Sequence, residues 1–159
     1  MIRFQLPLRF VGTIVIPVVA FAALIQFSAT ATEPVAEDSK PEPVADSMHH
    51  LMEYYFEPQF HKLKEAMAKE PADNAGWKPV KSATLILGEG GNLLIHRAPE
   101  EGKTEWLHEA EEIRKHGRMA YDAARKKDFA TARKQYESML RHCNSCHSKF
   151  ADGKYQLKP

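Results

Sequence analysis

Two cysteines and a histidine lie together near the C-terminus, in the run Cys143-Asn144-Ser145-Cys146-His147. On a helix, residues three and four apart share a face. Cys143 and Cys146 can therefore present both thiols to the two vinyl groups of one porphyrin, while His147 brings its imidazole to the iron. The chain has no other cysteine. This spacing predicts covalent attachment of one haem c, with His147 as an axial iron ligand.

Three other uses of these residues have less support from the surrounding sequence. A thioredoxin-like pair lies at the start of a helix that follows a strand, whereas this motif ends a long helical pattern. A zinc site needs four ligands, and beyond the two cysteines and His142 or His147 no second ligand pair of suitable spacing follows. A disulfide across two residues would stabilise the fold little, because it closes a very short loop.

Residues 1–31 have the features of an export signal. Two arginines, Arg3 and Arg9, precede an apolar run over residues 10–27, and Ala29 and Ala31 form a small-x-small cleavage site. The apolar run is also long enough to remain as a membrane anchor. In both cases we expect the rest of the chain to lie outside the cytoplasm, in the periplasm or an equivalent compartment.

Residues 32–46 are rich in proline, glutamate, alanine and valine and have no periodicity, which predicts a flexible linker. The formal charge of the chain is +1, from 22 basic and 21 acidic residues. Removal of the leader with its two arginines leaves 20 basic and 21 acidic residues, a charge of −1. Nucleic acid is therefore not an expected partner, because domains that bind it usually have a clear basic excess.

Residues 47–159 contain four segments with helical periodicity and no sustained strand pattern. The first begins at the cap Asp46-Ser47 and runs to about Lys69, and the second follows the cap Asp73-Asn74. The third starts at Thr104, and the fourth follows Asp128 and carries the cysteines on its apolar stripe. Four such helices with short connections predict an all-α, antiparallel four-helix bundle with the haem packed inside.

Two places interrupt these patterns. Pro58 lies inside the first segment, where it predicts a kink or the true start of the helix. Gly88, Gly90 and Gly91 lie inside the second, and each disfavours helix by about 1 kcal/mol relative to alanine. They predict a break, or a place where the backbone approaches a bulky group such as a haem edge.

In these features the chain resembles the cytochrome c-prime family, including its low-spin members. The resemblance covers Ser47 to about Ala151 and rests on the haem motif, on Phe150 three residues after it, and on the run Asp128-Phe129-Ala130-Thr131-Ala132 that opens the last helix. It implies an exported four-helix cytochrome and a homodimer packed through the first two helices. Ala151 differs from the family, many members of which have a basic residue beside the proximal histidine.

The resemblance also implies a second axial ligand. In this family the first helix meets the other haem face, and low-spin members place a methionine there, at the position equivalent to Met52. Met48 lies one turn earlier and is the nearest substitute, whereas ligation by His49 or His50 would lower the reduction potential. The other interpretation of Met52 is an ordinary core methionine. The remaining histidines are interpreted as surface or core residues without shared spacing: His61, His96, His108, His116 and His142.

These expectations combine into an exported electron-transfer cytochrome that exchanges single electrons with redox partner proteins through six-coordinate iron held by His147 and Met52. The alternative is a five-coordinate protein that binds nitric oxide or carbon monoxide on an open face opposite His147. An enzyme would need an acid–base group over the iron, and the sequence offers no residue for that role. We therefore expect a carrier and not a catalyst.

Overall fold

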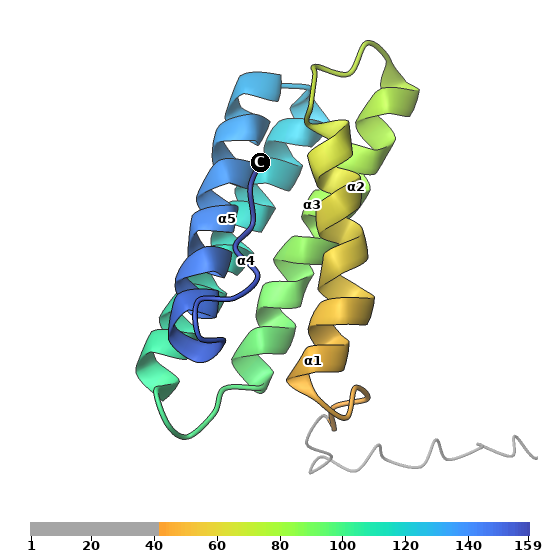
Figure 1. The fold of residues 1–159 in the computed structure, drawn as a ribbon. Coiled ribbons are helices and arrows are strands. Elements are labelled where there is room, and N and C mark those ends of the chain that lie inside the picture. Colours follow the sequence, from red (N-terminus) through yellow and green to blue (C-terminus); the bar gives the residue numbers. More distant parts are fainter. Residues whose placement is uncertain (1–41) are drawn as a thin grey trace, which may run out of the picture. The chain divides into compact units, whose positions relative to one another are not determined.

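Four helical segments run alternately up and down the computed structural model, which describes residues 42–159 (Figure 1). The first combines α1 (Met48–Leu51), the π-helical η1 (Met52–Phe56) and α2 (Glu57–Ala66) without interruption. The other three are α3 (Asn74–His96), α4 (Lys103–Lys126) and α5 (Phe129–Phe150). No strand occurs in residues 42–159. The prediction of an all-α chain with four antiparallel helices is confirmed.

Three helices begin where the sequence placed their caps. The Ser47 side chain accepts a hydrogen bond from the His50 amide at 3.1 Å. Asp73 accepts from the Gly76 amide at 2.8 Å, and Asp128 accepts from the Thr131 amide at 3.0 Å. Each bond satisfies one of the amide groups that a helix start leaves without a backbone partner.

Pro58 changes the hydrogen-bonding pattern of the first helix without ending it. It occupies an early position of α2, directly after the five π-helical residues Met52–Phe56. Proline has no amide hydrogen and its ring crowds the preceding turn, so a wider π-helical turn before it lets the helix continue. The predicted start of the helix at Pro58 is therefore wrong, and the helix begins at Met48 as the Ser47 cap predicted.

The predicted break at Gly88, Gly90 and Gly91 is also wrong, because α3 continues through all three. The alternative, a close approach of this backbone to another group, is what the structure contains. A Cβ atom added to Gly90 would lie 2.6 Å from the Phe56 ring. One added to Gly91 would lie 2.7 Å from Arg114 Cβ on α4. These glycines let α3 approach the first helix and α4.

The helices pack in chain order, with α2 against α3, α3 against α4 and α4 against α5. Their inward stripes form one apolar core. The six largest fully buried side chains of the described residues are Leu63, Met67, Val80, Thr84, Tyr136 and Met139. Cys146 belongs to this core and Cys143 packs against it. The prediction that both cysteines share the apolar stripe of the last helix is confirmed.

The leader 1–31, its apolar run 10–27 and linker residues 32–41 lie outside the described residues. The end of the predicted linker contacts the bundle: Ala45 packs against the core, and its carbonyl accepts a hydrogen bond from Arg97 at 3.0 Å. Within residues 42–159, no helix has both the length and the apolar character needed to cross a membrane.

Candidate haem-binding site

The predicted haem residues occupy the last two turns of α5. Cys146 is buried, with 7% of its surface exposed, whereas Cys143 and His147 are half-buried. The two cysteines are not joined by a disulfide. Both sulfur atoms therefore belong to the inward side of one helix, in the arrangement needed to hold a flat group along it.

Burial determines the chemistry of both thiols. Loss of solvation raises the pKa of Cys143 to about 12 and that of Cys146 to about 11. For Cys146 the nearby Glu109 carboxylate adds to this effect. Thiol–disulfide catalysis requires the opposite, a thiol whose pKa is lowered so that the thiolate forms near neutral pH. The geometry therefore does not favour the thioredoxin-like alternative.

The His147 ring is oriented by the backbone that follows the helix. Its Nδ1 atom lies 2.8 Å from the carbonyl oxygen of Tyr155. A carbonyl oxygen only accepts hydrogen bonds, so Nδ1 carries the proton and donates it. Nε2 then keeps its lone pair, and it makes no hydrogen bond with any residue in 42–159. This tautomer is the one that a histidine adopts when Nε2 ligates a metal.

The C-terminal segment turns back along α5 and is fixed there. Asn144, inside the motif, makes two hydrogen bonds to the backbone of Leu157: the Leu157 amide donates to Oδ1 at 2.7 Å, and Nδ2 donates to the Leu157 carbonyl at 2.9 Å. Further along, Lys64 of α2 donates to the Lys158 carbonyl at 2.9 Å. The segment thus lies between α5 and the first helix (Figure 1). It holds the Tyr155 carbonyl beside His147.

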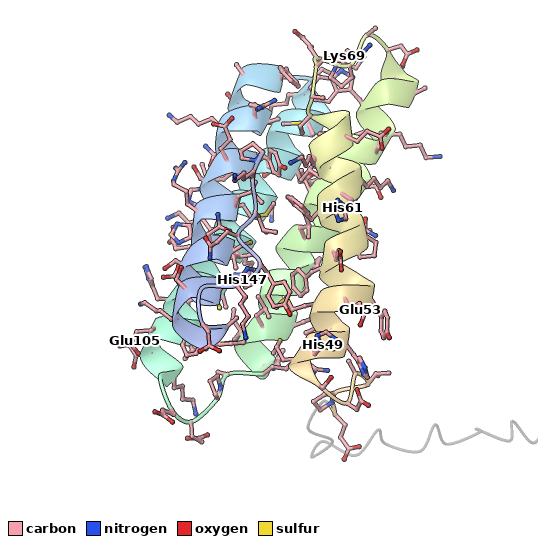
Figure 2. The ribbon with its side chains drawn as sticks, in the orientation of Figure 1. His49, Glu53, His61, Lys69, Glu105 and His147 are labelled. Carbon is pink, nitrogen blue, oxygen red and sulfur yellow. The ribbon has the colours of Figure 1, made fainter. Side chains whose placement is uncertain are left out.

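Met52 and His147 lie at similar heights along the long axis of the bundle. Met52 is the fifth residue of the first helix, and His147 lies three residues before the end of α5. With a rise of about 1.5 Å per residue, Met52 lies roughly 6 Å and His147 roughly 4.5 Å from the helix end. Those ends lie together in Figure 2, where His147 on α5 and His49 on the first helix occupy the same end of the bundle. Met52 is half-buried and packs against the core, as does Met48.

Two buried polar atoms in the interior lack hydrogen-bond partners among residues 42–159. They are the hydroxyl of Tyr136, on α5 two turns before Cys143, and Oε1 of Gln59, on α2 two turns after Met52. Burial raises the pKa of Tyr136 to about 12. An unsatisfied buried polar group costs about 1–3 kcal/mol, so such groups indicate a polar partner. The Tyr136 hydroxyl could donate to a carboxylate side chain of a haem, whereas Oε1 of Gln59 is an acceptor and would pair with a donor.

Phe150 is the aromatic residue that follows the motif, one turn after Cys146 on the same helix. Its ring meets the Trp106 ring edge-on, with 5.1 Å between centroids. It also covers Gly102, where an added Cβ atom would lie 2.8 Å from the Phe150 ring. Phe150 therefore closes the end of the bundle below the motif by joining α5 to the start of α4.

The structure brings together histidines for which the sequence analysis found no shared spacing. His108, Glu112 and His116 follow one another at intervals of four along α4, and His142 approaches them from α5. The repeated interval of four was a signal available in the sequence. The contribution of His142 was not, because it depends on the register between α4 and α5.

Glu109 anchors this second group of polar residues. Desolvation alone would raise the pKa of Glu109, but hydrogen bonds from Ser145 and His142 outweigh it, so the pKa lies below its ordinary value. The Ser145 hydroxyl donates to one carboxylate oxygen at 2.6 Å, and His142 Nδ1 lies 2.8 Å from the other. His142 therefore faces α4, and the structure does not bring it together with the cysteines as ligands of one zinc ion.

Comparisons with protein-family models, curated proteins and solved structures found no match to this chain.

Proposed function

We propose that this protein is an exported c-type cytochrome that transfers single electrons. Cys143 and Cys146 would hold one haem c through thioether bonds, and His147 would bind its iron through Nε2. Bound there, the haem supplies a one-electron couple between ferric and ferrous iron. The observation that carries this proposal is the hydrogen bond between His147 Nδ1 and the Tyr155 carbonyl, which leaves Nε2 available beside two inward-facing cysteines.

Met52 is the proposed ligand on the opposite side. Its level in the bundle, its half-buried position and its place on the helix across from α5 support this role. A methionine thioether favours ferrous iron and raises the reduction potential, and six-coordinate iron has no open position for a substrate. A site of this kind suits electron exchange with redox partner proteins in an extracytoplasmic compartment, and no catalytic step is required of the chain.

The covalent attachment can be tested by alkylation under denaturing conditions. The chain is produced in a host that matures c-type cytochromes, unfolded in guanidinium and treated with iodoacetamide at about pH 8. Thioethers cannot react, so we expect a mass equal to the chain plus one haem and no added carbamidomethyl group. Denaturation is essential, because burial alone would protect free thiols in the folded protein. A colourless chain that takes up two carbamidomethyl groups would contradict the proposal.

The second ligand can be tested with a pair of methionine variants. Met52→Ala should convert the oxidised spectrum from low-spin to high-spin and allow the reduced protein to bind carbon monoxide. Met48→Ala is the matched control, because it removes a half-buried methionine one turn away, and it should keep the wild-type spectrum. If reduced wild-type protein binds carbon monoxide readily and Met52→Ala leaves the spectrum unchanged, the iron is open and the gas-binding alternative is correct.

A further inference from the structure

A second group of metal-ligating side chains lies between α4 and α5, apart from the thiol stripe. We call it the His–Glu cluster and define it as Glu112 and His116 of α4 with His142 of α5. One ligand atom from each lies within 4.8 Å of the other two. All three residues are half-buried. Solvent therefore reaches the cluster on one side, and protein atoms surround it on the other.

The His142 ring is oriented by a buried carboxylate. Its Nδ1 lies 2.8 Å from Oε2 of Glu109, of which only 5% is exposed. The same carboxylate also accepts a hydrogen bond from Ser145. An ionised carboxylate only accepts hydrogen bonds, so Nδ1 of His142 is the donor. Its Nε2 points to Glu112, 3.8 Å from Oε2 of that residue.

The His116 ring is held in the same way. Its Nδ1 lies 2.7 Å from Oε1 of Gln135, a residue that is 8% exposed. An amide oxygen only accepts, so Nδ1 donates and Nε2 is directed to Oε2 of Glu112 at 3.4 Å. The His116 and His142 rings stack, with centroids 5.5 Å apart and 16° between their planes. Both histidines thus turn Nε2 toward one carboxylate.

This arrangement has both parts of a metal site: side chains that bind the metal, and residues that hydrogen-bond to those side chains and orient them. Metal-binding histidines usually donate their second ring N–H to a carboxylate or carbonyl, which fixes the ring and raises its basicity. Glu109 and Gln135 occupy that outer position here. Two imidazole nitrogens and a carboxylate oxygen then face one another as acceptors, and a cation between them would satisfy all three.

The spacing fits a specific class of cation. In a tetrahedral site with ligand bonds of about 2.0–2.1 Å, neighbouring ligand atoms are roughly 3.3 Å apart. The distances of 3.4 and 3.8 Å from Oε2 of Glu112 to the two Nε2 atoms need only small adjustments. Imidazole nitrogen with one carboxylate suits zinc and its transition-metal neighbours, whereas calcium and magnesium prefer sites made of oxygen.

Other glutamate–histidine pairs on the surface lack these features. Glu57 and His61 on α2 are also four residues apart, with 3.4 Å between Oε1 and Nε2. Both side chains are more than half exposed, and neither belongs to a group of three ligands among residues 42–159. Spacing by four on one helix is therefore common here, and the third ligand from α5 distinguishes the His–Glu cluster.

We propose that Nε2 of His116, Nε2 of His142 and the Glu112 carboxylate bind one zinc ion that joins α4 to α5. Water completes its coordination. The Lys115 ammonium, now 2.9 Å from the Glu112 carboxylate, is the surface cation that zinc would replace. The proposal does not depend on haem binding.

The proposal can be tested by isothermal titration of tag-free, chelator-treated mature protein with zinc chloride. We expect one strong site per chain, weakened at least about tenfold in Glu112→Gln and in His116→Gln. His142 is left intact because it adjoins the cysteine motif. Zinc should also raise the thermal midpoint of the wild type but not that of Glu112→Gln. The visible spectrum, or circular dichroism of a colourless chain, verifies that each variant folds.

Two control variants make the outcome decisive. His61→Gln removes the exposed histidine of the matched pair, and His108→Gln removes the neighbour that with Glu109 and His142 forms the other possible ligand group. Both should keep wild-type zinc affinity. The proposal is overturned if the wild type binds no zinc, if His61→Gln weakens binding as much as His116→Gln, or if His108→Gln abolishes it.

Discussion

The orientation of the His147 ring depends on a backbone carbonyl eight residues further along the chain. That carbonyl belongs to Tyr155, whose φ of 59° is left-handed and turns the backbone back toward the helix. Asn144 fixes the segment by bonding both backbone groups of Leu157. One residue of the haem motif thus positions the group that orients another.

Asn144→Ala should therefore raise the reduction potential of the mature protein. Without the two bonds to Leu157 the C-terminal segment would loosen, and in the proposed haem site His147 would lose the acceptor that makes its imidazole a stronger donor to ferric iron. The measurement is a spectroelectrochemical titration. Gln156→Ala is the control, because this side chain bonds Ser148 and Gly153 but not Leu157. Equal potentials in wild type and Asn144→Ala would contradict this role.

For individual residues, the sequence predicted the candidate site best where the residues are neighbours in the chain. Cys143, Cys146 and His147 are neighbours in the chain, so their grouping needs no knowledge of the fold. The acceptor at Tyr155 is a backbone carbonyl oxygen. Every residue type has one, so the sequence does not reveal it. The contact between His142 and Glu109 depends on the register between α4 and α5, which the sequence does not reveal.

The contact between α3 and α4 depends on two glycines that face each other. An added Cβ atom on Gly117 would lie 2.5 Å from Gly88 Cα, and one on Gly88 would lie 3.2 Å from the Gly117 carbonyl carbon. Both residues are buried. The helices therefore approach until their backbones touch.

Gly117→Ala should destabilise the fold by about 1–3 kcal/mol, despite the better helix propensity of alanine. The methyl group meets backbone, which cannot move aside without separating the helices. Urea unfolding monitored by circular dichroism measures the change. Arg118→Ala on the exposed side of the same turn should change stability by no more than about 0.5 kcal/mol. A Gly117→Ala protein as stable as wild type would show that the helices can separate without cost.

Helix starts were predictable from Ser47, Asp73 and Asp128, because a cap acts within a few residues. The error at Gly88, Gly90 and Gly91 came from reading intrinsic propensity alone. Tertiary packing outweighs that propensity here, since each glycine makes room for a neighbour. Gly117 on α4 makes room in the same way for α3.

Across the whole molecule, the first helix and α5 have few direct links. Arg133 of α5 donates to the Met67 carbonyl, and Lys64 of α2 reaches the C-terminal segment at Lys158. The continuous packing runs through α3 and α4 instead. A haem attached to α5 and ligated by Met52 would join the first and last helices directly.

Haem attachment should therefore protect the first helix more than the middle of the bundle. Hydrogen exchange measured by mass spectrometry on residues 47–159, with and without haem, should show α2 amides exchanging at least about tenfold more slowly in the mature form. Amides of α4 should change less, because α4 is packed on both sides without haem. Equal protection of α2 in the two forms would contradict a haem bridge between these helices.

The five-residue π-helical turn at Met52–Phe56 also has a consequence for how the sequence of such a bundle can change during evolution. A π-turn holds about one residue more than an α-helical turn, and one residue corresponds to about 100° around the axis. Loss of a single codon here would restore a plain α-helix and rotate Met48 and everything before the turn relative to α2. Gain or loss of one codon is thus a short evolutionary route to a different residue at the position proposed for the iron ligand, with the packing of α2 on α3 untouched.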